Sequence, residues 1–173
     1  PLVWVANAQA PFASMREMIA YARANPGKLA YGSAGAGGVN HLALELFKNK
    51  TGTDILHVPY KGIAPATTDL LGGSIMTLTG TIPAVLPHLK SGKARALAVT
   101  GDKRALLLPD VPTVKETGAN GTEVYNYWGI VAPVGTPAVV LQRLNGEVQK
   151  FLAQKEVQER LATDGVDLTP GGP

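Results

Sequence analysis

The residues best suited to binding chemistry form a glycine-rich stretch between Tyr31 and His41. Its sequence is Tyr-Gly-Ser-Ala-Gly-Ala-Gly-Gly-Val-Asn-His, directly after an apolar run and directly before a helical pattern. Small residues let backbone N–H groups approach a ligand closely, and the first turn of a helix leaves N–H donors unpaired. The partial positive charge of a helix start favours anions. The stretch therefore predicts a carboxylate-binding loop that needs no Lys or Arg, with Ser33 adding a hydroxyl donor.

Two further loops are expected beside it. Tyr60 follows the apolar run 54–58, and Gly80 and Thr81 follow the run 74–78. In open α/β sheets, ligands collect beyond the carboxyl ends of the strands, where all three loops would meet. We expect these loops to form the rim of one site.

The glycine-rich stretch does not match three more specific motifs that contain glycine. A dinucleotide fingerprint counted from Gly35 and Gly37 requires a third glycine where Asn40 stands. A P-loop requires a lysine at its end, and none lies between Lys28 and Lys48. A nucleophile elbow requires glycine in place of Tyr31. We therefore expect Ser33 to be a ligand donor and no nucleotide cofactor to bind.

An enzymatic alternative stays open. Ser33 and His41 could act as nucleophile and base, with Asp54 or Asp69 orienting the imidazole, in a hydrolase or acyltransferase that acts on a small carboxylate. The spacing of these residues gives no support for that geometry. The three histidines also lack the spacing of a metal site and the chain has no cysteine, so neither metal nor cofactor is expected.

The elements that must position the loops alternate along the chain. Strand-like apolar runs are separated by helical patterns, which predicts βαβ crossovers and a Rossmann-like α/β fold: a mainly parallel sheet with helices on both faces. Strands are expected at 2–6, 28–32, 54–58, 74–78, 94–100 and 123–131. Helices are expected at 14–24, 39–50, 64–71 and 83–91, the first with the capping box Ser14-Met-Arg-Glu17.

The last third of the chain differs in pattern. A long helix at 138–152 is expected to bury Leu141, Leu144, Val148 and Phe151, which share one stripe. A shorter helix follows and is expected to end near Gly165. The tail 169–173 reads as the start of a linker.

Composition narrows the class of protein. The 173 residues are 45% hydrophobic and 17% charged, which fits an ordered domain. The 16 Lys and Arg are spread from Arg16 to Arg160 without forming a block, so we expect no nucleic-acid partner. The absence of cysteine excludes disulfides, cysteine-based zinc sites and thiol nucleophiles.

Five strings together resemble one family: residues 30–41, 57–62 (His-Val-Pro-Tyr-Lys-Gly), 64–73, 86–100 and 108–114. The chain resembles the Bug family, the TctC-type periplasmic solute-binding proteins of tripartite tricarboxylate transporters. Order and spacing fit along essentially the whole chain. The sequence departs from the family at Met76 and Gly80, where an Asp is common, and this favours a plain carboxylate over an amino acid as ligand.

The resemblance implies one lobe of a type II periplasmic binding protein fold. Residues 1–173 would be a single α/β domain, the second lobe, with the first lobe and a closing C-terminal segment outside the chain. The implied partners are a small carboxylate and the transporter's membrane components, in the periplasm and without catalysis. A homodimer through the exposed half-cleft and a sensor or protein-interaction role remain alternatives. The expected ligand-binding residues are Ser33, Ala34, Gly35, Ala36, Gly37, Tyr60, Gly80 and Thr81.

Overall fold

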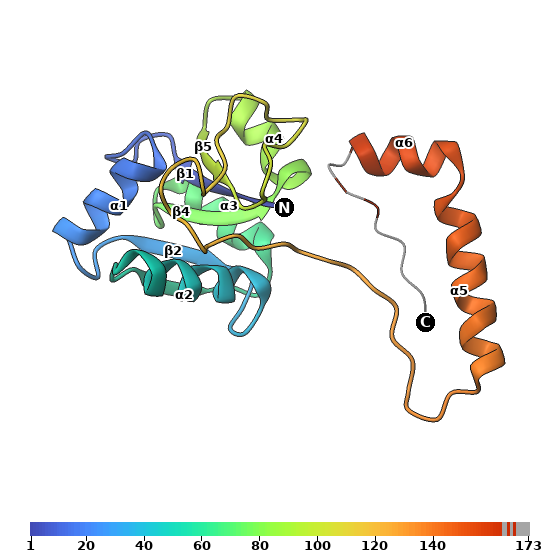
Figure 1. The fold of residues 1–173 in the computed structure, drawn as a ribbon. Helices are drawn as coiled ribbons and strands as arrows, with labels where there is room; N and C mark the ends of the chain where they lie inside the picture. Colours follow the sequence, from blue (N-terminus) through green and yellow to red (C-terminus); the bar gives the residue numbers. More distant parts are fainter. Residues whose placement is uncertain (164–165, 167, 169–173) are drawn as a thin grey trace. The chain divides into compact units, whose positions relative to one another are not determined.

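A five-stranded sheet with the order β3-β2-β4-β1-β5 organises the first of two units in the computed structural model (Figure 1). The structure describes residues 1–163, 166 and 168, and its two units are Pro1–Asn126 and Tyr127–Pro173. The strands are β1 Leu2–Asn7, β2 Ala30–Ser33, β3 Leu56–Pro59, β4 Thr77–Thr81 and β5 Ala94–Val99. The helices of this unit are α1 Met15–Ala24, α2 Val39–Thr51, α3 Ile63–Gly72 and α4 Ile82–Lys90.

Four of the five strands run in the same direction. Strand β2 is parallel to β3 and to β4, whereas β1 is antiparallel to both of its neighbours, β4 and β5. The predicted mainly parallel sheet is confirmed, with β1 as the one reversed strand. Because β1 is buried on both faces, its sequence is continuously apolar and lacks the alternation that often marks an antiparallel strand.

Helices cover both faces of the sheet, as predicted, and β1 lies between two cores. Trp4 and Ala6 face the core that contains α1 and α2, where Trp4 lies against Tyr31 and Phe47 with ring centroids 5.1 and 4.7 Å apart. Val3 and Val5 face the opposite core, formed with α3 and α4. The alternation of side chains along a strand thus divides β1 between the two layers.

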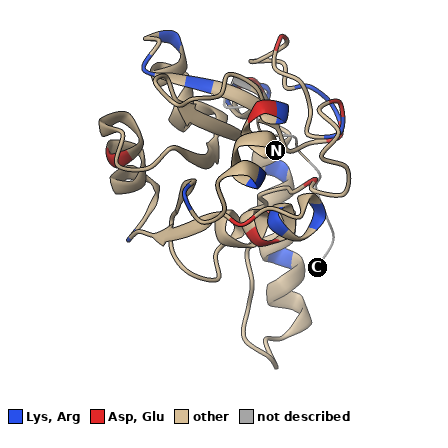
Figure 2. Ribbon diagram, turned by 90° about the vertical axis from the view of Figure 1, so that its left-hand side faces the viewer, with Lys and Arg blue, Asp and Glu red and all other residues tan. Residues whose placement is uncertain are grey.

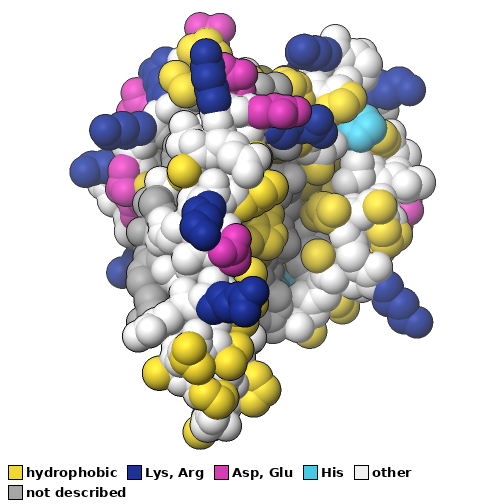
Figure 3. All heavy atoms as spheres, turned by 90° about the vertical axis from the view of Figure 1, so that its right-hand side faces the viewer, with side chains coloured by type: hydrophobic (Ala, Val, Ile, Leu, Met, Phe, Trp, Pro, Cys, Tyr) yellow, Lys and Arg dark blue, Asp and Glu magenta, His cyan; other side chains and the backbone are white. Residues whose placement is uncertain are grey.

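Two predictions for the last third of the chain are wrong. No strand forms at 123–131: Val124 N donates to Thr100 O, but none of these residues is in a strand, and Ile130 and Val131 are exposed. The helix α5 Ala138–Leu152 has the predicted bounds, but none of its residues is buried. It contacts α6 Lys155–Thr163. Of the stripe, Leu141 and Val148 are half-buried, and Leu144 and Phe151 are exposed. Exposed hydrophobic side chains are visible in Figure 3.

The remaining findings concern the C-terminal residues, membrane-spanning helices and the distribution of charged side chains. The predicted helix end near Gly165 and the predicted linker at 169–173 lie outside the described residues. Among the residues that are described, no helix has the length and apolar character needed to cross a membrane. In the view of Figure 2, basic and acidic residues are dispersed over several elements.

Candidate carboxylate-binding site

Three segments meet at one edge of the sheet because β2, β3 and β4 are adjacent and parallel. Strands β2 and β3 lead into the loops 34–38 and 60–62, before α2 and α3. Gly80 and Thr81 were predicted to follow a strand but are the last residues of β4, which runs directly into α4. Strand pairing also ties the first two loops together: Tyr60 N donates to Ser33 O at 3.0 Å, and Gly62 N donates to Ala34 O at 3.0 Å. The topology therefore collects the three predicted rim segments, as expected for a ligand site of an open α/β sheet.

The helices that begin at this edge have uncapped N-termini. The N-cap residues of α2, α3 and α4 are Gly38, Gly62 and Thr81; none forms a side-chain cap, and none of these helices has an acidic residue in its first turn. By contrast, Ser14 caps α1 and Glu17 lies in its first turn. Open N–H groups and an absence of competing carboxylates leave this edge electropositive without a cluster of Lys or Arg.

Within the glycine-rich loop, engaged amides alternate with open ones. Gly35 N donates to Ser33 Oγ at 3.2 Å, and Gly37 N donates to His41 Nδ1 at 3.0 Å. The amides of Ala34, Ala36 and Gly38 have no acceptor among the described residues. The loop thus has three amides without an acceptor, while two others hold its shape. Contact of Gly35 and Gly37 with a ligand stays a prediction.

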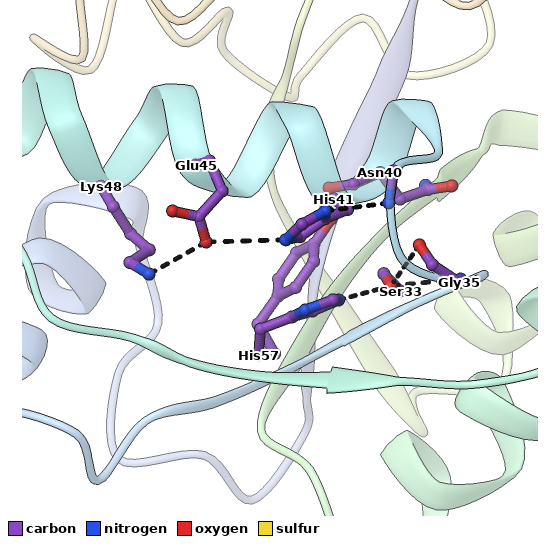
Figure 4. A network of polar contacts seen from close by, with 9 residues as sticks. Ser33, Gly35, Asn40, His41, Glu45, Lys48 and His57 are labelled. Atoms are coloured by element: carbon purple, nitrogen blue, oxygen red, sulfur yellow. Dashed lines mark hydrogen bonds and ion pairs between the residues drawn. The ribbon is translucent and has the colours of Figure 1, made fainter.

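Ser33 is fully buried, and its hydroxyl is hydrogen-bonded to His57 rather than to His41 (Figure 4). The distance from Ser33 Oγ to His57 Nε2 is 2.6 Å, and the same hydroxyl lies 3.1 Å from Gly35 O. Burial lowers the pKa of His57, and the neighbouring His41 lowers it further. The serine and histidine that the enzymatic alternative paired are therefore not hydrogen-bonded partners, and Ser33 already has several protein partners of its own.

His41 instead stacks on His57 and extends a polar chain along α2. The two rings are 4.1 Å apart and 15° from parallel. His41 Nε2 lies 3.8 Å from Glu45 Oε1, which also accepts a hydrogen bond from Lys48 at 2.9 Å. Among the described residues, no group of His, Asp and Glu could hold a metal ion.

The Tyr60 hydroxyl is directed to α3. Its oxygen donates to Asp69 Oδ2 at 2.7 Å, and burial together with this carboxylate raises the pKa of Tyr60 to about 12. A side chain at Gly32 would meet the Tyr60 ring at 3.3 Å. Tyr60 thus packs the second loop onto the sheet, and its predicted contact with a ligand remains untested.

Gly80 and Thr81 occupy different environments. Gly80 is buried, and a Cβ there would lie 2.7 Å from Val85 Cγ1, so only its backbone could face a ligand. Thr81 is half-buried at the start of α4, and its hydroxyl forms no hydrogen bond within the described part of the chain. Their ligand contacts also stay predictions.

A buried network behind the loop has no counterpart in the sequence-based prediction. Tyr31 Oη donates to Asn40 O at 2.8 Å, and Asn40 Nδ2 donates to Thr79 O at 2.7 Å and to Thr79 Oγ1 at 3.0 Å. Burial raises the pKa of the Tyr31 hydroxyl, so the phenol stays protonated. The network joins β2, the first turn of α2 and β4. The sequence signal was present, since Tyr31 and Asn40 flank the glycine-rich loop.

The sheet, its two helical layers and the loops at one edge define a lobe of a type II periplasmic binding protein. The TctC family, described as the tripartite tricarboxylate transporter family receptor, matches residues 1–171. The chain belongs to this family.

Solved structures agree with this assignment. A Rhodopseudomonas palustris protein, Rpa4515 with adipate, is 37% identical with a TM-score of 0.91, over 99% of this chain and 57% of that one. The periplasmic binding protein BugD is 35% identical (TM-score 0.85; 95% and 55% covered), and R. palustris MatC with bound malate is 29% identical (TM-score 0.83; 95% and 56% covered). The chain spans about half the length of the curated relatives it matches.

Proposed function

We propose that this chain is the second lobe of a periplasmic solute-binding protein that captures a small carboxylate for a tripartite tricarboxylate transporter. The observation that carries the proposal is the edge at which α2, α3 and α4 begin without side-chain caps or acidic residues. Such an edge stabilises an anion through backbone donors. Family membership and two similar structures that hold adipate and malate support a carboxylate as that anion.

The carboxylate would lie over the start of α2. The open amides of Ala34, Ala36 and Gly38 would be its backbone donors, and the Thr81 hydroxyl, at the end of β4, would supply a further donor. Ser33 acts from behind, because its buried hydroxyl orients the Gly35 peptide. Ser33, Ala34, Gly35, Ala36, Gly37, Tyr60, Gly80 and Thr81 are therefore the proposed ligand-binding and loop-forming set.

A substitution at Gly38 tests the site directly. This residue has φ −73° and ψ 168°, and a Cβ there would meet only Gly35 O, at 3.7 Å. An aspartate therefore fits, caps α2 and places a carboxylate where the ligand's would bind. We expect Gly38→Asp to weaken adipate and malate binding at least ~10-fold in calorimetry, about 1.4 kcal/mol, without loss of stability.

Two control variants separate charge from capping and position. Gly38→Asn provides a neutral cap of the same shape and should weaken binding less than the aspartate. Ser14→Asp adds the same charge at the start of α1, which lies outside the site, and should leave binding unchanged. Undiminished binding by Gly38→Asp would rule out this loop as the carboxylate site.

A serine hydrolase is the second candidate, favoured by the 2.6 Å contact between Ser33 and His57. Attack on a substrate requires an accessible hydroxyl, whereas Ser33 is fully buried. Hydrolysis of a p-nitrophenyl ester by the wild-type chain, abolished by Ser33→Ala, would favour the hydrolase. We expect no such serine-dependent turnover.

A further inference from the structure

We propose that His41 is a positioning residue of the carboxylate loop: its unprotonated Nδ1 holds the Gly37 amide, so that ligand affinity follows the protonation state of His41. The inference rests on the proposed function in one respect, since it takes the loop at residues 34–38 as the carboxylate site. The contact itself lies between two residues of this chain, Gly37 and His41.

The Gly37 contact fixes which ring nitrogen carries the proton. Gly37 N donates to His41 Nδ1 at 3.0 Å, so this nitrogen must present a lone pair. The neutral ring therefore carries its hydrogen on Nε2, on the side of Glu45. Gly37 itself has φ +79°, a left-handed conformation, and the hydrogen bond restrains this turn from the first turn of α2.

His57 completes the support from β3. It stacks on His41 and is hydrogen-bonded to Ser33 Oγ, which in turn contacts both the amide and the carbonyl of Gly35. The two imidazoles therefore hold two alternate residues of the loop, Gly35 and Gly37. The three amides that they leave open are those proposed to bind the carboxylate.

Protonation of the two rings has different consequences. A proton on His57 is compatible with its contact, because a protonated Nε2 donates to Ser33 Oγ. A proton on His41 Nδ1 removes the acceptor of Gly37 and releases the turn. The charged groups that face the pair are Glu45 and Lys48 on α2, which are 2.9 Å apart and pair with each other. We expect the release of the Gly37 turn to lower ligand affinity when His41 is protonated.

Two variants distinguish the acceptor from the ring. His41→Phe keeps an aromatic ring against His57 but has no acceptor, whereas His41→Asn keeps an oxygen near the Nδ1 position and does not titrate. With adipate and malate as probes, we expect His41→Phe to raise the Kd about tenfold, in proportion to one lost hydrogen bond. We expect His41→Asn to bind within about threefold of the wild type. Wild-type Kd should rise as the pH is lowered, and both variants should lack this rise.

If His41 had only a structural role, the Kd of the two variants would change in parallel with their melting temperatures, and the pH dependence of Kd would be the same as in the wild type. Binding by His41→Phe that is as tight and as pH-dependent as in the wild type would overturn the proposal.

Nuclear magnetic resonance of the amides tests the contact without any ligand. The Gly37 amide resonance should move with the titration of His41 in the wild type and stay fixed in His41→Phe. The Gly52 amide, which donates to Lys48 O at the far end of α2, is the control and should move in neither protein. Failure of the two-lobe protein that contains this chain to bind any small carboxylate would refute the proposed function, whereas a Gly37 resonance indifferent to His41 would refute this inference.

Discussion

The hydroxyl of Tyr31 lies 2.5 Å from the hydroxyl of Thr79, and this contact joins β2 to β4 inside the core. Both residues are fully buried, and Asn40 completes the network from the start of α2. A buried polar network of this kind is stabilising only when every member has a partner. All buried side-chain polar atoms in the described part of the chain are satisfied.

Tyr31→Phe is expected to lower the free energy of unfolding by about 1–3 kcal/mol, because it leaves partners of a buried hydroxyl unsatisfied. Urea denaturation measures the change. Tyr21→Phe on α1 is the matched control, since the Tyr21 hydroxyl makes no hydrogen bond among the described residues while its ring packs on Phe12. Equal stabilities of the two variants would contradict the role of the network.

Gly80→Ala is expected to destabilise the chain by about 1–3 kcal/mol through overpacking. The new methyl group would lie 2.7 Å from Val85 Cγ1, and the β-branched valine has little freedom to move away. Gly72→Ala is the control: a Cβ at this exposed end of α3 has no neighbour within 4 Å. Thermal and urea unfolding of both variants will show whether the cost is confined to Gly80.

Ser14→Ala is expected to lower the free energy of unfolding by about 1 kcal/mol, because Ser14 Oγ accepts from Glu17 N at the start of α1. Glu17 Oε2 in turn accepts from Ala13 N, one residue before the N-cap, rather than from Ser14 N as in the predicted capping box. Ser74→Ala, at an exposed turn after α3, serves as the control. A cost no larger than that of Ser74→Ala would mean that this cap contributes nothing measurable.

Glu116 is expected to contribute to the acid sensitivity of the fold. The Arg104 guanidinium and the Thr113 amide lower the pKa of Glu116 to about 2. A carboxylate with a lowered folded-state pKa contributes stability above its unfolded pKa of about 4.3 and loses it as pH falls towards 2. The difference in urea midpoint between wild type and Glu116→Gln should therefore shrink from pH 6 to pH 3. Glu147→Gln on α5 is the control variant, and the same narrowing there would contradict the assignment to Glu116.

The local elements of the fold could be predicted from sequence because their signals are local. The Ser14–Glu17 box marks the start of α1, and the glycine-rich loop between an apolar run and a helical pattern marks the turn from β2 to α2. The glycine and other small residues at that turn also predicted the position of the candidate site.

The pairing of side chains in the site could not be predicted, because it depends on strand register. Tyr31 on β2 is in register with His57 on β3, so Ser33 and His57 reach each other across two neighbouring strands. Strand β3 has four residues, too few for a periodic pattern to define its register or its faces. The direction of β1 could not be predicted either. All of its residues are buried, so the strand lacks the alternation of apolar and polar residues that indicates an antiparallel strand.

The reversed position of β1 in the middle of the sheet has a consequence for synthesis of the chain. Leu2–Asn7 is synthesised well before its hydrogen-bonding partners, β4 and β5, which begin only at Thr77 and Ala94. Contacts so distant in sequence are slow to form. Until they form, the apolar run Leu-Val-Trp-Val-Ala has both edges unpaired, and such segments associate readily with one another. The nascent chain must therefore be kept from aggregating through β1 until most of the first unit has been translated.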